Sequence, residues 1–417
     1  MKFIKKRDQF VSESNDSDID VPKVIWDIHS IFNEFGHKLY LVGGTVRDFL
    51  TAEDPKDFDI VSNATPDEIV KMLIDKFGVR KQKRDDYILN NRWRINQQGK
   101  SFGVVVVYVP GEVEGIDIAS FNTRHNGEIV MGVSLEDDAD RRDITFNALY
   151  YDLDSKEIID LVGGVEDLKN KRLNMVGDPN KRIQEDPLRI QRLFRFGPRY
   201  QAEMNQETKD AINNNKHLYR EPTDERPNGV SQERIIDEFM KSFKTLNFQD
   251  YIDYIDEFEM WNILFPGISF EKAPKFVDTK DIVLCLAQLF INEPNNIFNS
   301  VMVREWKLSD NVTKRVKLLV DLSKASTVKE FMNLKSAQLR FDVSNEFIQK
   351  WIDIIGSNDP LFSNFLKYDP TQVSSIDIMD ELGIEHTEDG KLINQRKDGP
   401  ILGRELAKRK TELFKSL

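Results

Sequence analysis

Two aspartates separated by a single residue lie in the stretch LVGGTVRDFLTAEDPKDFDIV, residues 41–61. Asp57 and Asp59 belong to an apolar, strand-like context that ends in FDIV. Because successive side chains of a strand alternate between its faces, both carboxylates would point the same way. Two carboxylates on one face repel each other unless cations lie between them, and hard oxygen ligands of this kind suit Mg²⁺. The pair therefore predicts a magnesium site.

A third carboxylate usually completes a site of this kind. Asp117, in the strand-like segment GIDIASF, is the best candidate. In a two-metal site the ions lie roughly 4 Å apart and stabilise both the attacking and the leaving oxygen of a phosphoryl displacement. We therefore expect Asp57, Asp59 and Asp117 to be catalytic and to hold two Mg²⁺ ions.

The glycine pair in the same stretch suggests a phosphate-binding turn. Gly43 and Gly44 follow an apolar strand and precede a predicted helix, so that backbone N–H groups can approach an anion without obstruction. Arg47 lies one turn into that helix, where its guanidinium could reach the same triphosphate. We assign Gly43, Gly44, Arg47 and the adjacent Asp48 to nucleotide binding. Each feature alone also fits an ordinary strand, a turn and surface charge; their combination favours the site.

A second set of charged residues has the spacing of one side of a helix. The segment EDPLRIQRLFRF places Asp186, Arg189, Arg192 and Arg195 at steps of three. A carboxylate accepts a hydrogen bond from an exocyclic amine, and a guanidinium donates to a ring nitrogen. Cytosine and adenine offer that edge, whereas uracil and guanine present a carbonyl, which would leave a bond unmade at a cost of about 1–3 kcal/mol. The set predicts selection of CTP and ATP; the alternative is an Asp186–Arg189 ion pair on a solvated helix.

Size and composition predict a multidomain globular chain. The 417 residues are 40% hydrophobic and 31% charged, which favours two to four domains. Cys285 is the one cysteine, so a reducing compartment fits. The N-terminus lacks a signal-peptide core and no stretch is apolar enough to span a membrane, so we expect a cytoplasmic protein. The net charge is −12, yet residues 80–94 and 394–417 are locally basic and could bind nucleic acid.

Periodicity divides the chain into a mixed α/β part and a helical part. Strand-like runs such as LYLVGG and FGVVVVYV dominate the first third, and YYDLDSKEIIDLVGG is typical of a hairpin. From Glu166 onward helical spacing prevails. We expect an α/β head followed by an all-helical remainder, with a loose arm at 1–20, the head at 21–155, and helical segments at 156–245, 246–350 and 351–417.

Several ordered blocks resemble one enzyme family. LVGGTVRDFL…PKDFDIV is similar to the signature of the nucleotidyltransferase family of bacterial-type CCA-adding enzymes and bacterial poly(A) polymerases. Further blocks follow in the family's order: LEDDADRRDITFNALYYD (135–152), DLVGGVEDLKNKRL (160–173), EDPLRIQRLFRF (185–196) and VSQERIIDEF (230–239). The resemblance implies a head, neck, body and tail, with base recognition in the neck (156–245) and RNA binding in the tail (351–417).

The resemblance also implies residue roles. Asp57 and Asp59 would hold the metal ions, and Gly44 and Arg47 the triphosphate. Arg142 and Asp143 would read the ribose, where Asp143 could accept a hydrogen bond from the 2′-OH. Asn147 would hold that segment in place. The same resemblance implies that Asp186, Arg189, Arg192 and Arg195 line the base and phosphate pocket.

Three functions remain open. The first is a CCA-adding enzyme acting on the 3′ end of tRNA with CTP and ATP, and without a membrane or obligate protein partner. The second is a poly(A) polymerase or an A-adding or CC-adding relative. The third is a catalytically silent RNA-binding relative, against which the intact Asp57/Asp59 pair argues. A Gly-Pro-x-x-Gly turn (Gly399, Pro400, Gly403) expected before a basic helix favours the first. Residues 80–94, expected to be a flexible loop, are longer and more basic than the family pattern.

Overall fold

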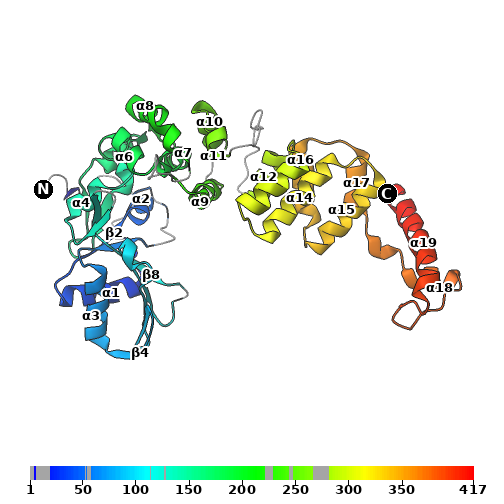
Figure 1. Cartoon of the computed structure of the whole chain (residues 1–417), viewed down its shortest axis with the longest axis horizontal. Helices are drawn as coiled ribbons and strands as arrows, with labels where there is room; N and C mark the ends of the chain where they lie inside the picture. The colour runs from blue at the N-terminus through cyan, green and yellow to red at the C-terminus, as the bar shows by residue number, and fades with distance from the viewer. Residues whose placement is uncertain are drawn as a thin grey trace. The chain divides into compact units, whose positions relative to one another are not determined.

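The computed structural model consists of two compact units, which are described separately (Figure 1). The first is Met1–Glu238 with Tyr254–Leu264, and the second is Phe239–Asp253 with Phe265–Leu417. The structure describes residues 4–5, 19–51, 53, 58–112, 114–125, 128–220, 229–243, 248–265 and 281–417. Asp57 and most of the expected N-terminal arm lie outside the described residues.

A ten-stranded sheet organises the first unit, in the order β1-β12-β11-β2-β3-β8-β7-β6-β5-β4. The strands are β1 Ile4–Lys5, β2 Leu39–Val42, β3 Ile60–Ser62, β4 Val79–Lys83, β5 Asp86–Leu89, β6 Arg94–Asn96, β7 Val104–Tyr108, β8 Ile116–Ser120, β11 Leu149–Asp152 and β12 Glu157–Asp160. Only β3 and β8 pair in parallel within this sheet; the other neighbours are antiparallel. The expected mixed α/β head is confirmed.

One face of the sheet is buried under two helices. α3 (Pro66–Phe77) lies against β7, and α1 (Lys23–Glu34) lies against α3 (Figure 1). α3 begins as its sequence predicts, because Thr65 and Glu68 form a reciprocal capping box. Alternate residues of β6, β7 and β8 on this face, including Ile95, Val107 and Ile118, are fully buried.

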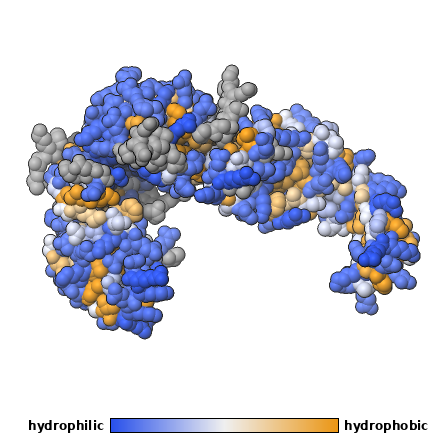
Figure 2. All heavy atoms as spheres, viewed as in Figure 1, coloured by the Kyte–Doolittle hydropathy of each residue, from blue (hydrophilic) through white to orange (hydrophobic). Residues whose placement is uncertain are grey.

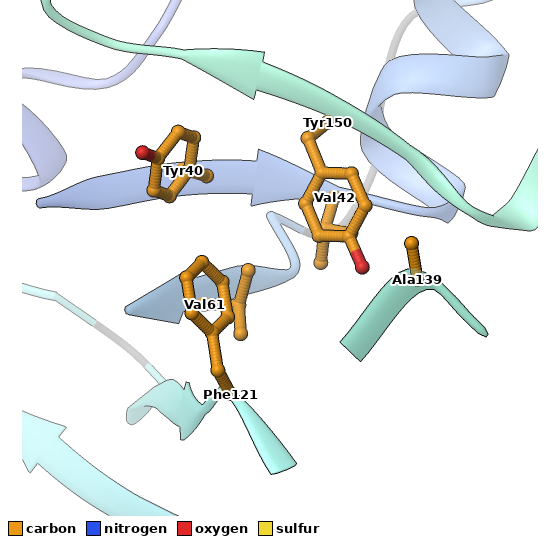
Figure 3. Close-up of a cluster of buried hydrophobic side chains, with 6 residues drawn as sticks. All are labelled: Tyr40, Val42, Val61, Phe121, Ala139 and Tyr150. Atoms are coloured by element: carbon orange, nitrogen blue, oxygen red, sulfur yellow. The ribbon is translucent and has the colours of Figure 1, made fainter. Parts of the chain in front are cut away.

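The opposite face is covered over only part of its width. Six buried side chains pack together there beneath α4 (Leu135–Asp140), as Figure 3 shows: Tyr40, Val42, Val61, Phe121, Ala139 and Tyr150. The ring centroids of Tyr40 and Phe121 lie 5.6 Å apart, and Tyr150 meets the Phe121 ring edge-on. Asp59 lies two residues before Val61 and therefore on this same face.

Short helices and two small sheets complete the first unit. The helices are α2 Gly44–Leu50, α5 Gly164–Lys169, α6 Pro179–Glu185, α7 Leu188–Tyr200, α8 Gln206–Asn215 and α11 Trp261–Leu264. The small sheets pair β9 (Asn122–His125) with β10 (Glu128–Met131), and β13 (Arg172–Leu173) with β14 (Glu203–Met204). Two more helices, α9 (Gln232–Ser242) and α10 (Phe248–Glu257), have residues in both units.

The second unit is helical throughout its described part. Its helices are α12 Ile282–Phe290, α13 Asn295–Asn299, α14 Asp310–Lys324, α15 Val328–Arg340, α16 Asn345–Ile355, α17 Pro360–Lys367, α18 Ser375–Glu381 and α19 Gln395–Lys415. Phe239 packs against Phe265 and Trp306 at one end of its core, with ring centroids 5.0 and 5.4 Å away. No helix among the described residues combines the length and the apolar character needed to cross a bilayer.

The structure corrects three expectations about local structure. Residues 80–94 form most of β4, β5 and the start of β6 rather than a loop, and the end of the head that carries β4 is hydrophilic in Figure 2. The strand β12 pairs with β11, so the sheet continues past the head boundary expected at residue 155. Ile4 and Lys5 of the expected loose arm pair with β12.

The expected C-terminal turn is also wrong. Gly399, Pro400 and Gly403 lie inside α19, which begins at Gln395. Asn394 caps the helix by accepting from the Lys397 N–H, so the helix starts more than a turn before the proline. Leu402 is buried with Ile378 and Met379 of α18, which anchors this part of α19. Packing of the helix therefore prevails over the turn propensity of the Gly-Pro pair.

Candidate active site

The turn between β2 and α2 brings its glycines against the carboxylate of Asp59. Gly43 has a φ of +60°, a conformation that other residues rarely adopt. A Cβ atom on Gly44 would lie 3.1 Å from Asp59 Oδ2 and 3.5 Å from Arg47 Nη2. The backbone N–H of Asp59 donates to Thr45 Oγ1 over 2.8 Å. The glycines are thus required for the close approach of turn and carboxylate.

Asp59 and Asp117 lie at the same level of neighbouring strands. Ile60 pairs with Ile118, so the residues that precede them, Asp59 and Asp117, are adjacent on one face. Both side chains are exposed. Partial loss of solvation raises the pKa of Asp117 above its ordinary value. A divalent cation beside these oxygens would fit, since it would favour the ionised form of both.

The described residues do not by themselves complete a metal site. They contain no group of three or more His, Cys, Asp or Glu side chains placed to hold a metal ion. Asp57, the third expected ligand, lies outside the described residues. The metal-binding roles of Asp57, Asp59 and Asp117 therefore remain predictions.

Arg47 is buried and joins three parts of the first unit. Its Nε and Nη2 donate to Asp48 Oδ1 over 3.0 and 2.9 Å, and its Nη1 donates to Asn147 Oδ1. Its guanidinium carbon lies 4.7 Å from the ring centre of Tyr200 and 5.2 Å from that of Phe196. These contacts give Arg47 a positioning role between α2 and α7, beside the triphosphate contact that the sequence predicts for it.

Asp48 is tied to α7 in the same way. It accepts hydrogen bonds from the Tyr200 hydroxyl over 2.9 Å and from Arg199 Nη2 over 3.2 Å. Tyr200 and Arg199 were not among the expected site residues, because they follow the recognised block in the sequence. Asp48 thus links α2 to the end of α7.

The expected ribose-reading carboxylate is held on both of its oxygens. Asp143 Oδ1 accepts from the Ile144 N–H over 2.8 Å and from Asn147 Nδ2 over 3.3 Å. Its Oδ2 accepts from Arg192 Nε over 2.6 Å. Burial acts to raise the pKa of Asp143, but Arg192 and these hydrogen bonds outweigh it and hold the pKa well below its ordinary value. Asp143 is consequently a carboxylate at neutral pH.

Arg142 is positioned by a buried acid that sequence reasoning missed. Asp138 has no exposed surface and accepts from Arg142, Arg141 and the Tyr150 hydroxyl. Arg142 Nη1 also donates to the Asn147 carbonyl over 3.4 Å. The signal for Asp138 was present in LEDDADRRD, where it precedes the two arginines by three and four residues on a helical spacing.

The expected stripe on one helix is only partly confirmed. α7 begins at Leu188, so Arg189, Arg192 and Arg195 lie on it while Asp186 precedes it. Pro187 disfavours a helical conformation at the preceding residue, and Asp186 is extended with a φ of −153°. Asp186 does not form the ion pair with Arg189 that the sequence offered as the alternative. Its Oδ2 accepts a hydrogen bond from Arg234 of α9 over 2.8 Å instead.

The three arginines of α7 each have a different partner. Arg189 donates to the carbonyls of Arg182 and Arg141, both over 2.8 Å. Arg192 pairs with Asp143, as described above. Arg195 pairs with the buried Glu238, and its guanidinium lies 4.1 Å from the Phe196 ring centre. Glu238 and Arg234 come from the block VSQERIIDEF, which could have pointed to them.

Most of the expected nucleotide-binding residues thus form one connected set. From Asp59 the contacts run through Gly44 to Arg47 and Asn147, then through Asp143 to Arg192. Gly43 joins the same set, since a Cβ there would lie 3.4 Å from the Asn147 carbonyl and 3.7 Å from Arg142 Nη1. Residues more than a hundred positions apart in the sequence therefore lie close together in the first unit.

The sequence of the chain is similar to those of several known proteins. A family model described as the poly A polymerase head domain matches residues 39–174. The chain is 29% identical over 317 residues to poly(A) polymerase I of Salmonella typhimurium, covering 71% of this chain and 60% of that protein. It is 31% identical over 308 residues to the CCA-adding enzyme of Ligilactobacillus salivarius, covering 68% and 66% of the two chains.

A solved structure shows the same fold over most of the chain. The crystal structure of the Bacillus stearothermophilus CCA-adding enzyme in complex with CTP superposes with a TM-score of 0.65 at 21% identity, covering 93% of each chain. The match to the first curated relatives spans 60% of their length. Together with the ordered blocks, the head-domain match and the curated relatives show that the chain belongs to the family of tRNA nucleotidyltransferases and bacterial poly(A) polymerases.

Proposed function

We propose that this protein is a template-independent RNA nucleotidyltransferase that adds CCA to the 3′ end of tRNA, using CTP and ATP. The observation that carries the proposal is the connected set from Asp59 through Arg47 and Asp143 to Arg192. It places a carboxylate suited to metal binding, a glycine turn suited to a triphosphate and an arginine-bearing helix suited to a base in one unit. The chain's likeness to a CCA-adding enzyme with bound CTP supports the same reading.

In the proposed mechanism the reaction takes place beside three carboxylates. Asp57, Asp59 and Asp117 would hold two Mg²⁺ ions. Bound divalent cations would supply charge stabilisation for an attacking 3′ oxygen and for departing pyrophosphate. Gly44 keeps the Asp59 carboxylate against the turn, and Thr45 holds its backbone. These contacts preorganise the carboxylate, which lowers the cost of reaching the reactive geometry.

The remaining residues of the set would orient the nucleotide. Asp143, ionised and fixed by Asn147 and Arg192, is suited to accept from a ribose 2′-OH and so to favour ribonucleotides. Arg142 is held close to the same segment through Asp138. Arg47 is buried against α7 and would thereby hold the turn that receives the triphosphate in place.

Base selection is assigned to Asp186 and the arginines of α7. Asp186 accepts a hydrogen bond from Arg234 in the structure, so its carboxylate already has a cationic partner. An ionised carboxylate accepts from the amine of cytosine or adenine and faces an acceptor in uracil or guanine. Arg189 would supply the complementary donor. Selection between CTP and ATP would then need no nucleic acid template.

The second candidate is a poly(A) polymerase or a partial A-adding or CC-adding enzyme. It is favoured by the likeness to poly(A) polymerase I, which covers 71% of this chain. The two candidates share every head residue discussed above. They differ in how many nucleotides are added and on which primer.

The test is incorporation of each labelled nucleotide onto tRNA transcripts that end before CCA, after C and after CC, beside an oligo(A) primer. We expect two cytidines and one adenosine on the first transcript, followed by a stop. Unlimited adenosine on any primer would establish the second candidate. Asp59→Asn is the inactive control, and incorporation by that variant at the wild-type rate would contradict the assignment of the carboxylates.

A further inference from the structure

The face of the sheet that carries Asp59 and Asp117 continues well beyond the cluster covered by α4. Strand register places Val104 and the hydrogen-bonded pair Asn96 and Asp86 on that face. It also places there, in order from β7 to the edge, Val106 and Tyr108, Arg94, Ile88, and Lys81 and Lys83. We call these six residues the open face. All are half-buried or exposed, whereas the alternate residues of β6 and β7 are fully buried on the other side.

The middle of the open face carries a stacked pair. Arg94 lies over the Tyr108 ring, with its guanidinium carbon 3.8 Å from the ring centre. Tyr108 belongs to β7, the strand next to that of Asp117, and pairs in register with Arg94. A half-exposed aromatic–guanidinium pair on a flat sheet is a surface on which nucleic acid bases stack without regard to sequence.

The edge of the open face is basic. Lys81 and Lys83 are exposed on β4, next to Arg80 and Arg84, and none of these four cations forms an ion pair with a described residue. Asp86, opposite Lys83, accepts instead from Asn96 Nδ2 over 2.9 Å.

Other lysines of the head are paired. Lys23 bonds Asp27, Lys71 bonds Asp75 and Lys100 bonds Asp67. In a chain with a net charge of −12, four neighbouring cations without acidic partners are complementary to a polyanion.

We propose that the open face is the track for the 3′-terminal strand of the RNA substrate, which would leave Asp117, cross Tyr108 and Arg94 and reach Lys81 and Lys83 with its phosphates. Five neighbouring strands, from β8 to β4, span about 19 Å at about 4.8 Å per strand. That length corresponds to roughly five or six nucleotides at the spacing of a helical strand, about 3.4 Å. The proposal rests on the function proposed above and adds the path of its RNA.

A purely structural reading explains only part of the pattern. Lysines on an edge strand hinder edge-to-edge pairing of sheets, which would account for Lys81 and Lys83. As a cross-strand pair, the Arg94–Tyr108 stack would itself stabilise the sheet, but stabilisation alone would not account for its position beside the strand of Asp117. The two readings make different predictions for RNA binding.

The test compares two double variants of the full chain, Lys81→Gln with Lys83→Gln and, as a matched control, Lys23→Gln with Lys71→Gln. The control removes the same charge from the helices of the opposite face. Binding of a fluorescent tRNA transcript without CCA is measured by anisotropy over a range of salt concentrations, without nucleotide. We expect the open-face variant to lose about 1.4 to 1.8 from the slope of log affinity against log salt. The control should keep the wild-type slope.

A third variant tests the stack. Tyr108→Leu should weaken binding of RNA with a single-stranded 3′ end at least about fivefold and leave a blunt RNA duplex unaffected. In turnover, the open-face variants should raise the KM for RNA while kcat at saturating RNA and the KM for nucleotide stay unchanged.

Equal salt slopes for the two double variants would overturn the proposal. Self-association of the Lys81/Lys83 variant together with unchanged RNA binding would identify the lysines as edge protection and would overturn it as well. Because binding is measured without nucleotide, the outcome does not depend on turnover. Failure of the wild-type chain to incorporate CMP or AMP would refute the proposed function, while the slopes would still decide whether RNA follows the open face.

Discussion

Replacing Gly44 by alanine should change the geometry of the site without lowering the stability of the fold. The new Cβ would lie 3.1 Å from Asp59 Oδ2, which is closer than ordinary packing allows, and 3.5 Å from Arg47 Nη2, which is an ordinary contact. The backbone of Asp59 is fixed, since its N–H donates to Thr45 Oγ1 over 2.8 Å and its carbonyl accepts from the Val42 N–H over 3.0 Å. The carboxylate must therefore move by a few tenths of an ångström.

The magnitude of the effect follows from that displacement. A misplacement of about 1 Å can cost roughly a hundredfold in rate, so a shift of a few tenths should lower kcat about three- to tenfold. Gly44 is the first residue of α2 and has an ordinary backbone conformation, so alanine there should leave stability unchanged or slightly raised. The Mg²⁺ concentration for half-maximal activity should rise, because Asp59 is an expected ligand.

The matched control is Gly43→Ala. Gly43 has a φ of +60° and a ψ of −114°, outside the left-handed helical region, and holding alanine in so sparsely populated a conformation costs on the order of 1–3 kcal/mol. This variant should lower the urea midpoint of unfolding, followed by circular dichroism, whereas Gly44→Ala should not. Single-turnover incorporation of CMP is measured for both. A Gly44→Ala enzyme with wild-type kcat and Mg²⁺ dependence would refute the assignment of Asp59 to the reacting centre.

Three further predictions concern the contacts that hold the site. Asp138→Asn removes a buried charge that its cationic neighbours require, so the free energy of unfolding should fall by about 3–5 kcal/mol in urea titration; a loss below about 1 kcal/mol would contradict the described network. Tyr200→Phe deletes the hydroxyl contact to Asp48 and keeps the ring beneath the neighbouring arginine, so it should cost about 1 kcal/mol, and an unchanged urea midpoint would count against that contact. The pKa of Asp143 is lowered in the folded state, so its contribution to stability is complete above its unfolded pKa of about 4 and is lost as pH falls toward the lower folded value. Asp143→Asn should therefore flatten the acid side of the stability profile between about pH 4 and pH 2, and parallel wild-type and variant curves would show that the reasoning fails.

Local patterns sufficed for much of the fold and for the candidate residues. The Thr65–Glu68 capping box and the apolar spacing that follows predicted α3 correctly, because capping and amphipathic periodicity act within a few residues. The strand-like runs in YYDLDSKEIIDLVGG predicted the β11–β12 hairpin for a similar reason, because a hairpin joins neighbouring segments. The spacing of Arg189, Arg192 and Arg195 placed them correctly on one helix.

Local patterns misled where tertiary packing competed with propensity. Residues 80–94 were expected to be a flexible loop because they are longer and more basic than the family pattern, yet strand pairing from β4 through β7 builds them into the sheet. Pro400 suggested a turn, although the buried Leu402 holds that segment in α19. In both cases contacts between secondary-structure elements decide the conformation.

Residue types and their spacing were enough to propose the chemistry of the site, because residue type decides which groups can hold a cation, accept from a hydroxyl or stack on a base. Asp59 and the α7 arginines were candidates from type and spacing alone, whereas Asp143 was a candidate from the resemblance to the family's ribose-reading block. The hydrogen-bond partners of these residues became known from the folded arrangement. Asp143 accepts from Arg192, and Asp186 accepts from Arg234 rather than pairing with Arg189. The reason is physical. Spacing specifies neighbours within a turn or a strand, whereas the match of a buried charge with its counterion is settled by elements that meet only after the chain has folded.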